Sequence, residues 1–318
     1  MRTVRSFAAM ALMFGLGEVV QAGSSSTPAM LTLPVHETSP ALSLDPAIYH
    51  LPAVVYPRGL NLVFVADGYP SWETFMQDTE LLLNSLKTVE PWKSYTRYNL
   101  YQIRPPENLC TITSQHERKP VLRCAPEQIN PYLIRLGLHR YKLIVLSRQP
   151  FQSWANVSRL SNSGLFFSLP ESPNTPADWQ TTDWLFLHLI GHAFGLKDEE
   201  QFVIANAHSA AARPDGPNCA PDRATAEQWW GDLVGHDSPV GYFPRCAGNR
   251  LSIKPTQSSL MNLNDLSNFT PTYGPVSERY LRMMLNLCFS DQPTNLEPTE
   301  KDFLDRYPEF QRCISERT

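Results

Sequence analysis

Two histidines, a glycine and an aspartate near the middle of the chain have the spacing of a metal site. His188 and His192 lie four residues apart in a mostly apolar stretch, so a helix there would place both imidazoles on one face. Two imidazoles at this spacing can bind a single Zn²⁺. Gly195 can end the helix in a left-handed conformation, and the following turn then returns Asp198 as a third ligand. The sequence therefore predicts a zinc site formed by His188, His192 and Asp198.

The same residues also have an interpretation without metal. Histidines often pack on apolar helices, Gly195 can be an ordinary helix stop, and Asp198 can be a surface carboxylate. The positions of Gly195 and Asp198 after the histidines together favour the metal site. A helix that only packs needs no turn that brings a carboxylate back to its histidine face.

The residue after the first histidine is Leu189, at the position where zinc peptidases with this spacing carry a glutamate. That glutamate moves a proton from the attacking water to the leaving amine, which leucine cannot do. Proton transfer of this kind typically contributes about 10²–10⁴ in rate, so we expect low or absent peptidase activity. Asp183 should point away from the histidine face, while Glu199 and Glu200 should be solvated or should support the ligands.

Composition restricts the class of protein. The 318 residues are enough for one large domain or two modest ones, and 42% hydrophobic residues can build a core. The 27 basic and 31 acidic residues are well mixed and give a net charge of -4. No basic surface for nucleic acid or anionic lipid is therefore expected.

The first 22 residues have the pattern of a secretory signal peptide. Arg2 and Arg5 precede the short apolar run Phe7–Leu16, and small residues up to Ala22 offer a cleavage site. An uncleaved anchor is the alternative. No later segment approaches about 20 uninterrupted apolar residues, so we expect no membrane span in the mature chain. The predicted location is secreted or periplasmic.

The cysteines favour disulfides, because an even number in an exported chain is typical of paired thiols. Six cysteines allow 15 pairings. The close spacings along the sequence favour Cys110–Cys124, Cys219–Cys246 and Cys288–Cys313.

Strands and helices alternate in the part of the chain before the histidines. The apolar run Leu60–Asp67 predicts a buried strand, and apolar residues at three- and four-residue spacing predict a helix from Ser71 that ends before Pro91. Further strands are expected at Tyr98–Arg104, Tyr141–Leu146 and Gly164–Leu169, with a helix near Pro126–Leu138. This order predicts an α/β (α+β) fold, with a twisted mixed sheet backed by the Ser71 and His188 helices.

The chain divides into four predicted parts. Residues 1–22 are the signal peptide, 23–58 an extended Ser/Thr/Pro-rich lead-in, 59–198 a subdomain that carries the zinc helix, and 199–318 a C-terminal subdomain. This last part should be mostly irregular, with helices near Thr225–Leu233, Val276–Leu287 and Glu300–Tyr307.

Eight short motifs lie along the third and fourth of these parts. They are Asn61–Tyr69, Pro91–Tyr95, Tyr98–Tyr101, His188–Glu199, Pro217-Asn218, Gly241-Tyr242, Lys254-Pro255 and Ser258–Met261. Together they cover most of residues 60–290 and resemble the IgA-peptidase-type zinc metallopeptidases, which are relatives of the metzincins.

This resemblance implies a metzincin-like fold and a zinc ion held by His188, His192 and Asp198. It also implies a methionine turn beneath the site, where Met261 lies in the sequence, although a methionine that simply fills a core is the alternative. Family members tend to have Arg-Pro before that turn and a cysteine two residues before the methionine. This chain has Lys254-Pro255 and Ser259 instead, so its C-terminal part diverges from the family.

Three functions remain open from the sequence. The first is an exported metallopeptidase homologue with an impaired site, retained for zinc-dependent binding of a peptide or glycoprotein partner. The second is an active secreted metalloendopeptidase that uses a non-standard base. The third is a structural or adhesive exported domain without metal, in which the two histidines are buried relics.

Overall fold

Most of the chain after residue 47 is described by the computed structural model. The described residues are 48–51, 55–105, 109–113, 120–124, 126–138, 140–151, 153–155, 163–169, 176–199, 216–235, 238–262, 271–290 and 298–315. All of them belong to one compact unit, Ser43–Thr318. The predicted signal peptide and most of the lead-in lie outside the described residues.

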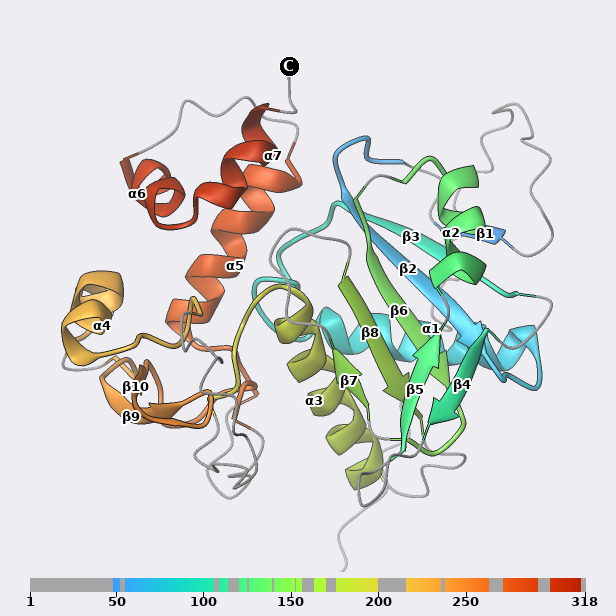
Figure 1. Cartoon of the computed structure of the whole chain (residues 1–318), viewed down its shortest axis with the longest axis horizontal. Coiled ribbons are helices and arrows are strands. Elements are labelled where there is room, and N and C mark those ends of the chain that lie inside the picture. The colour runs from blue at the N-terminus through green and yellow to red at the C-terminus, as the bar shows by residue number, and fades with distance from the viewer. Residues whose placement is uncertain are drawn as a thin grey trace, which may run out of the picture. The chain divides into compact units, whose positions relative to one another are not determined.

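A six-stranded mixed sheet forms the centre of this unit (Figure 1). Its strand order is β1-β3-β2-β6-β8-β7, with β3, β2, β6 and β8 parallel and the two edge strands antiparallel to their neighbours. The bounds are β1 Ile48–Leu51, β2 Leu60–Asp67, β3 Tyr98–Ile103, β6 Lys142–Ser147, β7 Trp154–Ala155 and β8 Ser163–Ser168. The predicted mixed α/β fold is therefore confirmed.

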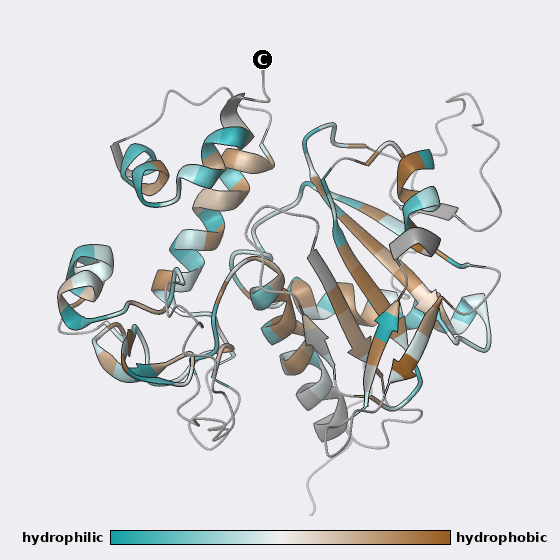
Figure 2. Ribbon diagram, in the orientation of Figure 1, coloured by the Kyte–Doolittle hydropathy of each residue, from teal (hydrophilic) through white to brown (hydrophobic). Residues whose placement is uncertain are grey.

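Both faces of the sheet are covered, which explains why the central strands are mostly apolar (Figure 2). Alternate residues of β2 reach two separate cores. Leu62 and Phe64 join the core that contains the helices α1 (Trp72–Leu86) and α3 (Pro176–Ala193). Val63 and Val65 join the core under α2 (Pro126–Arg135) and the hairpin of β4 (Cys110–Thr113) and β5 (Val121–Cys124).

The helix α1 begins where the sequence predicts. The hydroxyl of Ser71 accepts a hydrogen bond from the amide of Thr74 at 3.1 Å, which satisfies one of the free N–H groups at the helix start. Because α1 and α3 share one core, α1 supports the helix that carries the two histidines.

The C-terminal part contains helices at the three predicted places, and also one hairpin that the sequence did not predict. Its elements are α4 Arg223–Trp230, η1 Gly231–Leu233, β9 Phe243–Cys246, β10 Asn249–Lys254, α5 Pro275–Cys288, α6 Pro298–Arg306, η3 Pro308–Phe310 and α7 Gln311–Ser315. The helix α5 packs into the same core as α1 and α3 through Leu281 and Met284. The hydroxyl of Tyr280 also donates to the carbonyl of Phe194, just after the end of α3, at 3.0 Å.

All three predicted disulfides are present, and no cysteine is free. Cys110–Cys124 closes the β4–β5 hairpin, and Cys288–Cys313 joins α5 to α7. Cys219–Cys246 joins the segment before α4 to the end of β9.

Within the described part of the chain, no helix has both the length and the apolar character needed to cross a membrane.

Lys142 is a buried cation at the start of β6. Its ammonium donates to the carbonyl of Ala193 at 2.7 Å and lies 4.7 Å from the centre of the Phe194 ring. It therefore binds one of the carbonyls left without a partner at the C-terminus of α3. Burial lowers the pKa of Lys142 to about 7.

This burial predicts a pH dependence of stability. Between about pH 7 and pH 10 the unfolded chain binds a proton at Lys142 that the folded chain does not. The burial penalty is therefore fully present below pH 7 and disappears as the pH rises toward 10. The free energy of unfolding should rise across this window by up to about 1.4 kcal/mol per pH unit.

We expect Lys142→Met to remove that rise and Lys301→Met, at an exposed position on α6, to retain it. Urea unfolding at several pH values in this window measures both variants against the unmodified protein. A pH dependence that survives in Lys142→Met would contradict the assignment.

Candidate metal site

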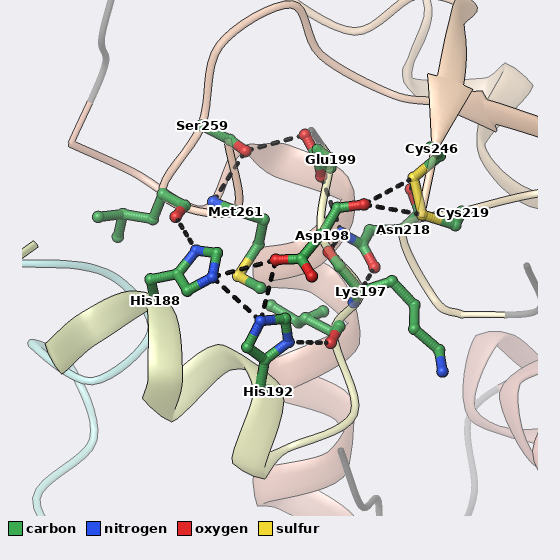
Figure 3. Close-up of polar contacts among 12 residues, drawn as sticks. His188, His192, Lys197, Asp198, Glu199, Asn218, Cys219, Cys246, Ser259 and Met261 are labelled. Atoms are coloured by element: carbon green, nitrogen blue, oxygen red, sulfur yellow. Dashed lines mark hydrogen bonds and ion pairs between the residues drawn. A yellow bond between two sulfur atoms is a disulfide. The ribbon is translucent and has the colours of Figure 1, made fainter. Parts of the chain in front are cut away.

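The structure brings the three predicted ligands together (Figure 3). The Nε2 atoms of His188 and His192 lie 3.1 and 3.0 Å from Oδ1 of Asp198, and 3.0 Å from each other. Both histidines come from the last turns of α3 and are 6% and 7% exposed. The side chain of Asp198 is 48% exposed, so the site is reached from the side of this carboxylate.

Gly195 makes this arrangement possible, as the sequence predicts. Its φ of 97° lies in the region that favours glycine, and the amide of Leu196 donates to the carbonyl of Gly191 at 3.0 Å across the helix end. The chain therefore turns back over the last turn of α3. This turn places Asp198 beside the two imidazoles.

The protonation of both histidines follows from their second ring nitrogens. Nδ1 of His188 lies 2.8 Å from the carbonyl of Leu260, and Nδ1 of His192 lies 2.9 Å from the carbonyl of Leu196. A carbonyl oxygen can only accept, so each Nδ1 carries a proton and donates it. In a neutral imidazole this leaves a lone pair on Nε2, which is the form that binds metals.

When both imidazoles are neutral, three acceptor atoms therefore point at one region with no donor among them. Neutral imidazoles place no proton between the two Nε2 atoms, and such close acceptors repel one another unless a cation lies between them. Tetrahedral bonds of about 2.0–2.2 Å to one Zn²⁺ put neighbouring ligand atoms about 3.3–3.6 Å apart. The observed separations of 3.0–3.1 Å are slightly shorter, so a tetrahedral ion would move the three atoms a little apart. The nitrogen and oxygen donors suit Zn²⁺ and also other divalent ions that accept imidazole and carboxylate.

The charges of the cluster favour a cation as well. Burial alone would raise the pKa of Asp198, but its contacts with the imidazoles of His188 and His192 lower it below its ordinary value. Burial would lower the pKa of His192, but the nearby Asp198 outweighs that effect and raises it, so without a metal ion Nε2 of His192 takes up a proton more readily than a free imidazole does. The carboxylate is therefore ionised and attracts positive charge to this point.

Met261 lies close to the two histidines (Figure 3). Its side chain is fully buried and packs against α3 at Gly191. A Cβ atom at Gly191 would lie 2.5 Å from the sulfur of Met261 and 3.0 Å from the ring of Tyr273. The methionine loop therefore approaches α3 only because the residue there is glycine.

Gly191 is a site residue that sequence reasoning missed, although a signal was present. A glycine inside a helix costs about 1 kcal/mol relative to alanine, so it calls for a packing reason. Its place directly before His192 pointed to a close contact beneath the histidine pair.

No acid or base occupies the position after His188. Leu189 is 4% exposed and belongs to the main core. Asp183 lies on the side of α3 that faces α1, where it accepts a hydrogen bond from Ser85 at 2.6 Å, as its spacing from His188 predicts. Glu200 lies outside the described residues.

Glu199 is fully buried and serves as an anchor for the loops around the site. Burial raises its pKa. Its carboxylate accepts hydrogen bonds from Asn218, Ser259 and Thr256 at 2.9, 2.8 and 3.1 Å, and its backbone carbonyl accepts one from Lys254 at 2.8 Å. Both carboxylate oxygens are therefore bound to other groups, and Glu199 does not face the ligand atoms as a base.

Searches against protein-family models and against curated proteins give no match to this chain.

The contact at Gly191 predicts a loss of stability in Gly191→Ala. The added methyl group should displace Met261 and Tyr273, and this overpacking should outweigh the helix propensity gained, for a net loss of about 1–2 kcal/mol. Gly235→Ala is the control, because an added Cβ there meets nothing within 4 Å, and it should change stability by less than about 0.5 kcal/mol. Chemical unfolding of the metal-free proteins measures both, and equal stabilities would contradict the close contact.

Proposed function

We propose that this protein is an exported, zinc-metallopeptidase-like protein that binds zinc but has lost the proton-transfer group of a peptidase. In this proposal it is retained for zinc-dependent binding of a peptide or glycoprotein. The observation that carries it is the convergence of two imidazole Nε2 atoms and one carboxylate oxygen within 3.0–3.1 Å. A bound zinc ion would supply a Lewis acid that can polarise a carbonyl group.

The proposed relation to metzincin-like enzymes has support beyond the ligands. A helix packed on a mixed sheet provides both histidines, and a buried methionine from a distant loop lies beside them. The same loop provides the carbonyl of Leu260 that orients His188. These features agree with what the resemblance to IgA-peptidase-type metallopeptidases implies for residues 60–290.

The surroundings of the ligands favour binding over hydrolysis. Leu189 is in the core, Asp183 is bound to Ser85 on α1, and Glu199 is bound by three side chains. None of these positions presents a free base to a molecule at the exposed side of Asp198. This favours an impaired peptidase over an active one with a non-standard base.

The site also argues against a purely structural role without metal. Buried polar groups in a structural core are paired as donor and acceptor, because unpaired ones cost free energy. Here two neutral imidazoles would present acceptors to each other at 3.0 Å. A proton on one Nε2 would relieve only the contacts of that nitrogen, whereas a metal ion binds all three acceptors at once.

Export is supported by the covalent structure. The three disulfides use all six cysteines, and such bonds persist in oxidising compartments. Together with the signal-like residues 1–22, they support a secreted or periplasmic location.

Metal analysis tests the proposal directly. Protein purified without a histidine tag under metal-replete conditions should contain about one zinc ion per chain. Asp198→Ala should weaken zinc binding at least about 100-fold, since loss of a ligand should cost no less than loss of its supporting partner. Asp183→Asn, at the other side of α3, should leave the affinity unchanged. A zinc content near zero in the unmodified protein would end the metal-site proposal.

A peptidase assay tests the loss of catalysis. The unmodified protein should cleave protein substrates no faster than His192→Ala. Leu189→Glu should restore metal-dependent cleavage, whereas the similarly shaped Leu189→Gln should not, because an amide cannot act as a general base. Robust cleavage by the unmodified protein that His192→Ala abolishes would refute the impaired-enzyme view.

A further inference from the structure

The loop that carries the third ligand is held on both sides of Asp198. The amide side chain of Asn218 accepts a hydrogen bond from the backbone N–H of Lys197 at 2.8 Å and donates to its carbonyl, also at 2.8 Å. The same side chain donates to the carboxylate of Glu199 at 2.9 Å. The residues before and after Asp198 are therefore bound to a single asparagine.

Asp198 itself is held by a second segment. Its backbone carbonyl accepts a hydrogen bond from the N–H of Ala247 at 2.8 Å, at the tip of the β9–β10 hairpin. Arg245 and Ala247 both have positive φ values, of 73° and 51°. Residues other than glycine adopt this conformation at a free-energy cost, and surrounding structure must hold them there.

A disulfide joins these two segments. Cys219 directly follows Asn218, and Cys246 directly precedes Ala247. The sulfur atoms of Cys219 and Cys246 pack 3.7 and 3.5 Å from the carbonyl oxygen of Asp198 (Figure 3). The covalent bond therefore passes directly behind the third ligand.

We propose that Asn218, Ala247 and the Cys219–Cys246 disulfide form a clamp that positions Asp198 for the metal ion. This inference rests on the proposed zinc site and adds what sets its affinity. A half-exposed aspartate beyond a helix end would otherwise lose conformational freedom on binding the ion, and a preformed position removes that cost. Mutation of the groups that hydrogen-bond to metal ligands commonly lowers the affinity for the metal by about 10–100-fold.

A second disulfide offers a matched control for general stabilisation. Cys288–Cys313 spans 25 residues and Cys219–Cys246 spans 27, so their contributions from loop closure should be similar. Cys288–Cys313 joins α5 to α7, and neither helix carries one of the three ligands. A disulfide that only stabilises the fold would act alike in both positions.

The experiment compares Cys219→Ala/Cys246→Ala with Cys288→Ala/Cys313→Ala. Zinc dissociation constants come from competition with a chelator, and the stability of the metal-free proteins comes from urea unfolding. We expect similar losses of stability, but an increase of at least about tenfold in the zinc dissociation constant only in the first variant. The absorption spectrum of bound Co²⁺ should also change only there. Unchanged zinc affinity and Co²⁺ spectrum in the first variant would overturn the clamp.

Asn218→Ala gives an independent test that leaves all disulfides intact. It should weaken zinc binding, whereas Asn99→Ala should not, although Asn99 is also a buried, hydrogen-bonded asparagine at the far side of the sheet. In an Asp198→Ala background, loss of the clamp should have no further effect on zinc affinity, because its target is gone. A full further loss in that background would assign these groups to general stability and overturn the clamp.

The two proposals fail in different ways. If the unmodified protein binds no zinc, both the zinc site and the clamp are overturned. If it binds zinc and the clamp variants bind it equally well, only the clamp is overturned.

Discussion

The meeting of three acceptor atoms at one point is the constraint on which the rest of the structure depends. Hydrogen bonds to the carbonyls of Leu260 and Leu196 fix the proton of each histidine on Nδ1 and direct both Nε2 lone pairs at Asp198. Without a cation this arrangement is repulsive, so it needs surroundings rigid enough to hold it. The buried residues around it supply that rigidity. In our proposal the ion then binds to a preformed set of ligands.

The end of α3 shows how distant parts of the chain share this task. Lys142 from the sheet binds the carbonyl of Ala193, and Tyr280 from α5 binds that of Phe194. The turn at Gly195 uses the carbonyl of Gly191. The last carbonyls of a helix have no partner within the helix. Here they accept hydrogen bonds from the sheet, from a C-terminal helix and from the turn itself. The position of the histidines therefore depends on the whole fold and not on α3 alone.

Local patterns carried the part of this arrangement that the sequence could predict. The strand β2, the start of α1 at Ser71 and the left-handed Gly195 follow from periodicity, capping and turn chemistry, which act over a few residues. The contact between Gly191 and Met261 and the clamp around Asp198 join residues far apart in the sequence, and no periodicity encodes them. The β9–β10 hairpin was missed for a related reason. Its strands are short, and its two-residue turn has Ala247 at positive φ before Gly248, where asparagine or aspartate would be the usual signal.

Binding and catalysis make different demands on such a site. Holding a carbonyl group at a metal needs ligands in fixed positions and an open side, and here Asp198 is 48% exposed. Hydrolysis needs in addition a group that moves a proton, and the position after His188 holds a leucine that is 4% exposed. The ligands and their supports draw on four separate segments, whereas the missing base is a single side chain. A chain that keeps the former without the latter has the physical requirements for a metal-dependent binding protein, and catalysis would return only with a carboxylate able to leave the core and face the open side of the site.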